Sequence, residues 1–379
     1  MKKLIVKVLC VSLLVGLFTG CSANTGGDSK DEGSVYKIAV VAPMTGDNAE
    51  YGKCFAAAAE IMVEQWNAKG GVNGKKIQVA AYDDKNSGED AVSIAQKIVS
   101  DKDVVGVIGH FSSGVSMAAA PTYEENKLVE ISPSASHPDY SSCGDYIFRN
   151  NTVISSEATV IVDVLENDLK VKKVGIISIK TDWGTSAGTI TKELIEKNDS
   201  LELVAHEEVM ESSDDYSPAI AKLKEAGAEA VICVGMYNLL APVSKQYKAV
   251  DPEIKVVGFS NAYTEQVIEL GGEAVEGLMA PVSFYSESED PLVKEFVAKY
   301  KEKMGNEPSS LTAQAYDSVG ILLTALQEAG SFDKELLREK VAQIKYKGTT
   351  GETYFDKIGD ATKVFTKVIV KDGKFVKYE

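Results

Sequence analysis

The sequence predicts an α/β protein with two doubly wound sets of strands and helices. Short apolar runs rich in Val and Ile alternate with stretches whose apolar residues recur every three or four positions. Several runs are continuously apolar, which is typical of parallel strands covered by helices on both faces. The chain has 379 residues, 44% of them hydrophobic and 25% charged, and this length suits two domains.

The first set of elements opens where the polar N-terminal stretch ends. We expect strands over Tyr36–Ala42, Ile77–Tyr82, Val104–Ile108 and Val129–Ser132, and helices over Tyr51–Lys69, Glu89–Ser100 and Ser116–Asn126. The glycine-rich turn Gly70–Gly74 ends the first helix. Strand and helix alternate throughout, which favours a doubly wound sheet.

A second set follows without a long linker. We expect strands over Lys173–Ile179, Leu201–Glu208, Ala230–Gly235 and Lys255–Phe259, and helices over Ser155–Asn167, Gly184–Lys197, Ser217–Ala226 and Leu239–Ala249. The tail differs, with long helices over Pro291–Met304 and Leu311–Ala329 and an antiparallel finish over Gly351–Asp356 and Lys363–Val370. The sequence therefore predicts two Rossmann-like lobes.

The N-terminus has the layout of a secretory signal. Three Lys residues precede an apolar run from Val8 to Phe18, and Thr19-Gly20-Cys21 follows. We predict a signal peptide over residues 1–20 and lipidation of Cys21, as in bacterial lipoproteins, although Phe18 stands where Leu is usual. The run is shorter than the roughly 20 residues that span a bilayer. Residues 21–35 would form a flexible, polar tether. The alternative is an ordinary cleaved signal with a chance Cys.

The charge of the chain argues against nucleic acid as a partner. The sequence has 40 basic and 56 acidic residues. The predicted signal contains three Lys and no acid, so its removal leaves 37 basic residues against 56 and a net charge near −19. Binding to phosphates needs basic patches, so we expect no nucleic-acid partner.

The reactive residues do not indicate an enzyme or a metal site. Outside the predicted signal and Cys21 remain Cys54, Cys143 and Cys233, whose wide spacing allows one disulfide but favours none. The sequence has no C-x-x-C pair, its three His are far apart, and the G-x-G-x-x-G, phosphate-loop and G-x-S-x-G motifs are missing. We expect a non-catalytic protein without metal or cofactor.

The turns after the predicted strands are the candidate binding region, because ligands of open α/β sheets lie at the carboxyl ends of strands. One turn contains Ser112 and Ser113, and the next contains Ser134, Ala135 and Ser136. Their hydroxyl and N–H groups could hold a carboxylate at a helix N-terminus. Helix capping is the alternative.

Aromatic residues occupy three further turns. Tyr51, Trp183 and Tyr237 could line an apolar ligand pocket, with core or interlobe packing as the alternative. His110 and His137 lie beside serines, but adjacency in sequence rarely gives the geometry of a nucleophile and its base. We therefore interpret both His as polar turn residues.

Several segments, taken together, resemble a known family. They are Ile38–Gly46, Tyr51-Gly52, Asn67–Gly71, Tyr82–Asp84, Val107–His110, Ser132–Ser134, Trp183-Gly184 and Ala315–Asp317. In order and spacing the chain resembles the Leu/Ile/Val-binding protein type of type I periplasmic binding protein, over about residues 36–375.

The resemblance implies two lobes joined by three hinge crossovers, with the ligand in the cleft between them. Lobe one would comprise residues 36–151 and 284–344, and lobe two residues 152–283 and 345–379. Closure about the hinge would trap the ligand.

The resemblance also assigns roles to residues. Ser113, the Ser134-Ala135-Ser136 turn and the Ser136 hydroxyl would hold the carboxylate of an amino acid, and Tyr51 would line the side-chain pocket. Trp183 and Tyr237 would line the second lobe. At the position where relatives pair an acid with the ligand ammonium, the turn after Val256–Gly258 offers Asn261 and no carboxylate.

The implied function is solute capture for an ABC importer. The expected protein is a monomeric, extracytoplasmic lipoprotein on the bacterial cell membrane that delivers a branched-chain or related amino acid to ABC permease subunits. Because Asn261 brings no charge, a short carboxylate or amide is the alternative ligand. A sensor that reports ligand state to a membrane signalling protein is the alternative function.

Overall fold

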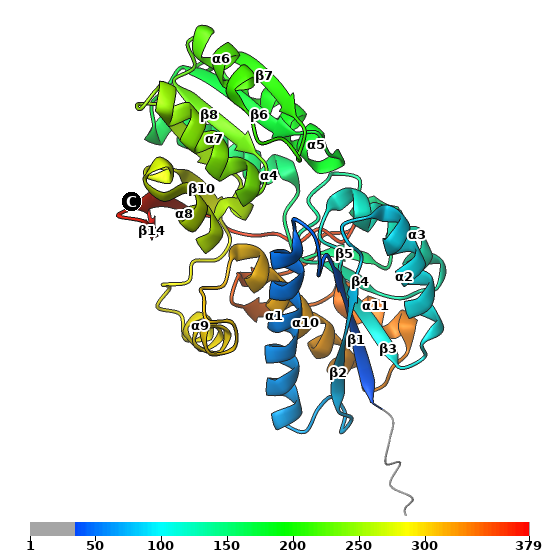
Figure 1. Ribbon diagram of the computed structural model, residues 1–379. Helices are drawn as coiled ribbons and strands as arrows, with labels where there is room; N and C mark the ends of the chain where they lie inside the picture. The colour runs from blue at the N-terminus through cyan, green and yellow to red at the C-terminus, as the bar shows by residue number, and fades with distance from the viewer. Residues whose placement is uncertain (1–34, 379) are drawn as a thin grey trace, which may run out of the picture. The chain divides into compact units, whose positions relative to one another are not determined.

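Two main sheets carry the fold in the computed structural model, which describes residues 35–378 (Figure 1). The first sheet has the order β2-β1-β3-β4-β5, and all its strands are parallel. Its strands are β1 (Tyr36–Ala42), β2 (Ile77–Asp83), β3 (Val104–Gly109), β4 (Glu130–Ser132) and β5 (Ile147–Arg149).

Alternate side chains of β1 show how helices cover both faces of the first sheet. Ile38 and Val40 pack in the core cluster that contains α1 (Ala49–Ala68) and α10 (Ser310–Ala329). Ala39 and Val41 pack in another cluster, which contains α2 (Gly88–Ser100) and α3 (Ser113–Glu125). Because both faces are buried, β1 is apolar almost throughout instead of alternating. Figure 1 shows α1 on one side of these strands and α2 and α3 on the other.

The second sheet has the order β14-β13-β10-β9-β8-β6-β7. Its strands are β6 (Lys173–Ile179), β7 (Glu202–Val209), β8 (Ala230–Val234), β9 (Lys255–Gly258), β10 (Met279–Val282), β13 (Thr366–Lys371) and β14 (Lys374–Lys377). The strands from β7 to β10 pair in parallel, whereas β13 and β14 are antiparallel. The fold is therefore the predicted pair of Rossmann-like units.

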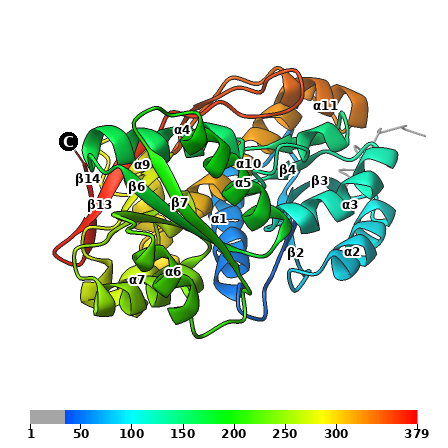
Figure 2. The same ribbon diagram turned by 90° about the horizontal axis from the view of Figure 1, so that it is seen from above.

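Helices also cover both faces of the second sheet (Figure 2). Val174 and Ile176 of β6 pack with α4 (Ile154–Asp163) and α5 (Asp182–Glu196), whereas Ile177 and Ile179 pack with α6 (Ser217–Glu225) and α7 (Tyr237–Val250). The remaining helices are α8 (Glu265–Gly271), α9 (Pro291–Met304) and α11 (Lys334–Ala342), and a hairpin joins β11 (Tyr346–Gly348) to β12 (Gly351–Thr353).

Three crossover segments run between the two sheets, the first at Asn150-Asn151, the second at Ser283 and the third at the β11–β12 hairpin. Hydrogen bonds link all three, mostly through Gln314 of α10. The Gln314 amide nitrogen donates to Asn151 Oδ1 (3.0 Å) and to Ser283 Oγ (3.3 Å). Asn150 Nδ2 donates to the Gln314 carbonyl (2.9 Å), and Asn150 Oδ1 accepts from Thr353 Oγ1 (3.5 Å). The crossovers thus form one buried polar network in which α10 is the common element.

The structure corrects several predicted boundaries. The third helix begins at Ser113 instead of Ser116, and this places Ser113 in its first turn. The short strands β5 and β10 were not predicted, because runs of three and four residues carry little periodicity. The predicted finish is wrong in part, since β12 pairs with β11 and β13 begins only at Thr366.

The N-terminal predictions lie outside the described residues. These are the signal peptide, the lipidated Cys21 and nearly all of the tether. Within residues 35–378, no helix is both long and apolar enough to span a membrane. Cys54, Cys143 and Cys233 are free thiols, with Cys54 and Cys233 buried. The exact lobe boundaries stay a prediction.

Candidate functional site

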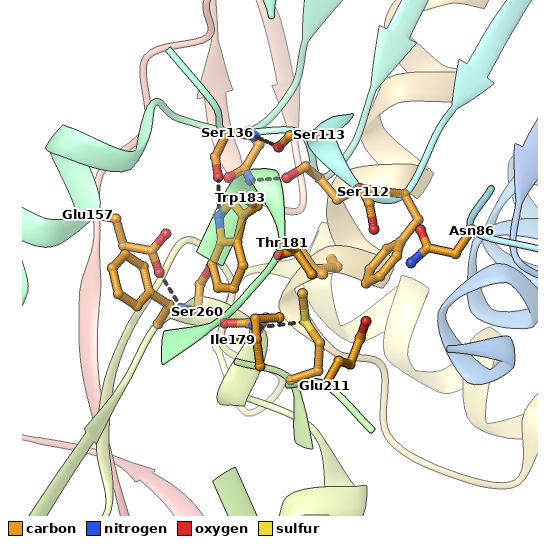
Figure 3. A pocket seen from close by; sticks show the side chains of 17 residues that line it. Asn86, Ser112, Ser113, Ser136, Glu157, Ile179, Thr181, Trp183, Glu211 and Ser260 are labelled. Atoms are coloured by element: carbon orange, nitrogen blue, oxygen red, sulfur yellow. Dashed lines mark hydrogen bonds between the residues drawn. The ribbon is translucent and has the colours of Figure 1, made fainter. Parts of the chain in front are cut away.

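A pocket at the carboxyl ends of strands from both sheets is the candidate site (Figure 3). Its cavity volume is about 40 Å³, and the wider empty space around it, about 540 Å³, includes open solvent. Its lining combines polar residues (Asn86, Ser112, Ser113, Ser134, Ser136, Asn151, Glu157, Thr181, Glu211, Ser260 and Asn261) with apolar ones (Phe111, Ile179, Trp183, Met236, Phe259 and Leu311).

Ser113 presents a hydroxyl proton to this pocket. Its side chain is 2% exposed, and its Oγ accepts hydrogen bonds from the backbone N–H of Ser136 (3.2 Å) and of His137 (3.3 Å). A hydroxyl has two acceptor sites and one donor. Because both acceptor sites are occupied, the remaining capacity of Ser113 is donation. Ser113 also lies in the first turn of α3, where the N–H groups and the helix dipole favour an anion.

Ser136 completes the donor side of the pocket. Its Oγ accepts from the indole Nε1–H of Trp183 at 2.9 Å, so its proton is free to donate elsewhere. Ser134 differs, since its hydroxyl already donates to the carbonyl groups of Phe111 (2.7 Å) and His110 (3.3 Å). The Ser134 side chain therefore positions the turn, and Ser113 and Ser136 are the hydroxyl donors.

Glu157 is one of the lining residues that the sequence analysis missed, and the most unusual of them. It lies in the first turn of α4, is 3% exposed, and accepts a hydrogen bond from the backbone N–H of Ser260. Burial raises the pKa of its carboxyl to about 7, while the N–H and hydroxyl of Ser260 act in the opposite direction. A helical Glu is ordinarily solvated, so no local pattern marks it as buried.

Asn261 also lines the pocket. Its Nδ2 donates to the Gly235 carbonyl and to the sulfur of Met236, both at 2.8 Å. Its Oδ1 is buried and has no hydrogen-bond partner among the described residues. The amide therefore offers an acceptor to whatever enters the pocket.

Three predicted site residues are not among the residues that line the pocket. Tyr51 is covered because its ring stacks on Phe111, with 4.5 Å between ring centroids, and Phe111 takes its place on the wall. Tyr237 turns its hydroxyl to the carbonyl of Asp47 at 3.0 Å. Ala135 is fully buried in a core cluster. Contact of these three residues with a ligand is therefore not supported by the geometry.

The two His near the serines have structural partners. His110 is fully buried, with Nδ1 2.7 Å from Asp84 Oδ2 and Nε2 3.1 Å from the Tyr123 hydroxyl. His137 accepts at Nδ1 from the backbone N–H of Asp139 (3.2 Å). Neither ring is paired with a serine hydroxyl, so the arrangement is that of a binding site and not of a nucleophile with its base.

Comparison with known proteins shows the family of the chain. The model of the periplasmic binding protein family matches residues 35–373. The chain belongs to this family. As a periplasmic binding protein it is extracytoplasmic and binds a solute without transforming it, and the predicted type I fold is confirmed.

Named relatives define the branch of the family. A Leu/Ile/Val-binding protein homolog 1 from Brucella abortus is 30% identical, and the match covers 85% of this chain and 86% of the relative. A leucine-, isoleucine-, valine-, threonine- and alanine-binding protein from Pseudomonas aeruginosa is 28% identical, with 86% of each chain covered.

A solved structure adds a related fold with a ligand. The branched-chain amino acid transporter substrate binding protein of Streptococcus pneumoniae, in complex with isoleucine, has a TM-score of 0.83 and 26% identity. The match covers 91% of this chain and all of that one. The relatives are therefore substrate-binding proteins of branched-chain amino acid transporters.

Proposed function

We propose that this protein is the receptor of an ABC importer and that it captures a branched-chain or related amino acid. The observation that carries the proposal is the free donor capacity of Ser113 and Ser136 beside the N-terminus of α3. This arrangement complements a carboxylate. Phe111, Met236 and Phe259 supply apolar surface for an aliphatic side chain. The names of the relatives support the same ligand class.

The proposal includes the cellular setting. A lipid on Cys21 would hold the mature protein at the outer face of the cell membrane, and residues 21–35 would serve as its tether. A monomer of this kind would deliver its solute to ABC permease subunits. Neighbouring permease and ATPase genes would support this partner, whereas a lone membrane kinase gene would favour the sensor.

Ser113→Ala tests the assigned ligand end. A hydrogen bond to a charged group contributes about 1.5–3 kcal/mol, so its loss should weaken binding on the order of 10- to 100-fold. Isothermal titration calorimetry with leucine, isoleucine and valine measures this for residues 35–379. The matched control is Ser100→Ala, because Ser100 is exposed and bonds only within its own helix. Equal affinities for both variants would remove the carboxylate assignment.

A further inference from the structure

Glu157 is a buried carboxylate without a positive partner. In residues 35–378 no Lys, Arg or His side chain forms an ion pair with it, and no cation is among the causes of its altered pKa. The Ser260 N–H and its position in the first turn of α4 favour the anion but do not balance its charge. Burying an unpaired charge costs free energy, so a ligand that brings a cation to this carboxylate would be stabilised by pairing with it.

A second acceptor lies in the turn after β9, whose backbone binds the Glu157 carboxylate. Ser260 binds the Glu157 carboxylate, and the following residue, Asn261, presents the buried Oδ1 that has no partner among the described residues. Asn261 as a residue is 7% exposed, and its amide is held in place by the hydrogen bond from Nδ2 to the Gly235 carbonyl. An ammonium has three donors and no acceptor, so a charged oxygen and a neutral amide oxygen both suit it.

The donor groups come from other elements of the wall. Figure 3 shows both pairs: the Ser113–Ser136 hydrogen bond joins the turns after β3 and β4, whereas the Glu157–Ser260 bond joins α4 to the turn after β9. One part of the lining thus offers O–H and N–H donors for an anion, and another offers acceptors for a cation. A ligand that carries both charges satisfies both parts, whereas a plain carboxylate leaves Glu157 unpaired.

We propose that Glu157, assisted by the amide oxygen of Asn261, binds the cationic group of the ligand and makes the pocket selective for a zwitterion over a carboxylate. This inference rests on the proposed function. In this arrangement Glu157 of α4 supplies the negative charge that the turn after β9 lacks. Glu211 is a weaker candidate, since its carboxylate is half-buried and already accepts from Asn48 Nδ2 at 3.2 Å.

The test compares leucine with 4-methylpentanoate, which has the same skeleton without the ammonium. Both are titrated at pH 8 into the wild type and into Glu157→Gln, with Glu225→Gln as the matched control, because Glu225 is an exposed acid of α6 outside the lining. Gln keeps an acceptor for the Ser260 N–H, so the variant should fold, and its melting temperature checks this. We expect Glu157→Gln to weaken leucine binding at least tenfold without weakening 4-methylpentanoate, and Glu225→Gln to change neither affinity.

The other outcomes separate the two proposals. If the wild type binds leucine and Glu157→Gln binds it equally well, only the role of Glu157 is overturned. An equal loss for both ligands overturns it as well, since it would indicate a structural role. A wild type that prefers 4-methylpentanoate, or that binds neither ligand, overturns the amino-acid function together with this inference.

Discussion

At the scale of single residues, the binding of an amino acid should depend on the charge of Glu157. Burial raises the pKa of this carboxyl to about 7, so it is mostly protonated at pH 6 and mostly ionised at pH 8. Only the ionised form pairs with an ammonium. The dissociation constant for leucine should therefore rise about tenfold from pH 8 to pH 6 and change little above pH 8.

Calorimetry over this pH range measures the effect, with Glu157→Gln as the control. The variant should show a nearly flat profile, although Glu211, the other ionisable residue of the lining, is still present. The contribution of Glu157 to the stability of the fold changes with pH in the opposite direction to its contribution to binding. The folded chain holds the Glu157 proton more tightly than the unfolded chain, so the carboxyl's contribution to stability is lost as pH rises from about 4.5 to 7. A steep profile in Glu157→Gln would assign the pH dependence to another group.

At the scale of elements, α10 is held to the third crossover by one carboxylate. Asp317 is fully buried and accepts four hydrogen bonds: from the N–H and hydroxyl of Thr349 (2.9 and 3.0 Å) and from those of Thr350 (2.8 and 2.6 Å). Lys363 Nζ donates to Thr350 Oγ1 at 2.8 Å. This network fixes the β11–β12 hairpin against the helix that also binds the other two crossovers.

Asp317→Ala should therefore lower the free energy of unfolding by about 3 kcal/mol or more, because it leaves buried donors without an acceptor. Urea denaturation followed by circular dichroism measures the loss. Glu328→Ala is the matched control, since Glu328 is an exposed acid of the same helix. Similar midpoints for the two variants would contradict the assigned role of Asp317.

At the scale of the whole molecule, Trp183 connects the two sheets at the pocket. It follows β6 of the second sheet, yet its indole donates to Ser136, which follows β4 of the first. The chain has two Trp residues, and Trp66 lies in α1 away from the lining. A bound solute should alter the surroundings of Trp183 alone.

Intrinsic fluorescence of single-Trp variants tests this expectation. Leucine should change the emission of Trp66→Phe, in which Trp183 remains. The emission of Trp183→Phe should stay constant, because only Trp66 then contributes. A change in the second variant but not in the first would place the bound solute away from the described pocket.

The sequence predicts most of this molecule but not the charge of its pocket. The strand positions follow from continuous apolar runs, and the serine turns follow from their place after those strands. Glu157 was missed because its surroundings are tertiary: its hydrogen-bond partner Ser260 lies 103 residues further along the chain. The stacking of Phe111 on Tyr51 could not be predicted for a similar reason, since it is a tertiary contact.

The free thiols have a practical consequence for handling the protein. Burial raises the pKa of Cys54 and of Cys233 to about 12, so neither forms a thiolate in ordinary buffers. Cys143 is half-buried outside the pocket lining, and partial burial raises its pKa as well. A chain that begins at Val35 thus contains one thiol for maleimide conjugation in mildly alkaline solution. A dye or a sensor chip can be attached there without engineering a cysteine.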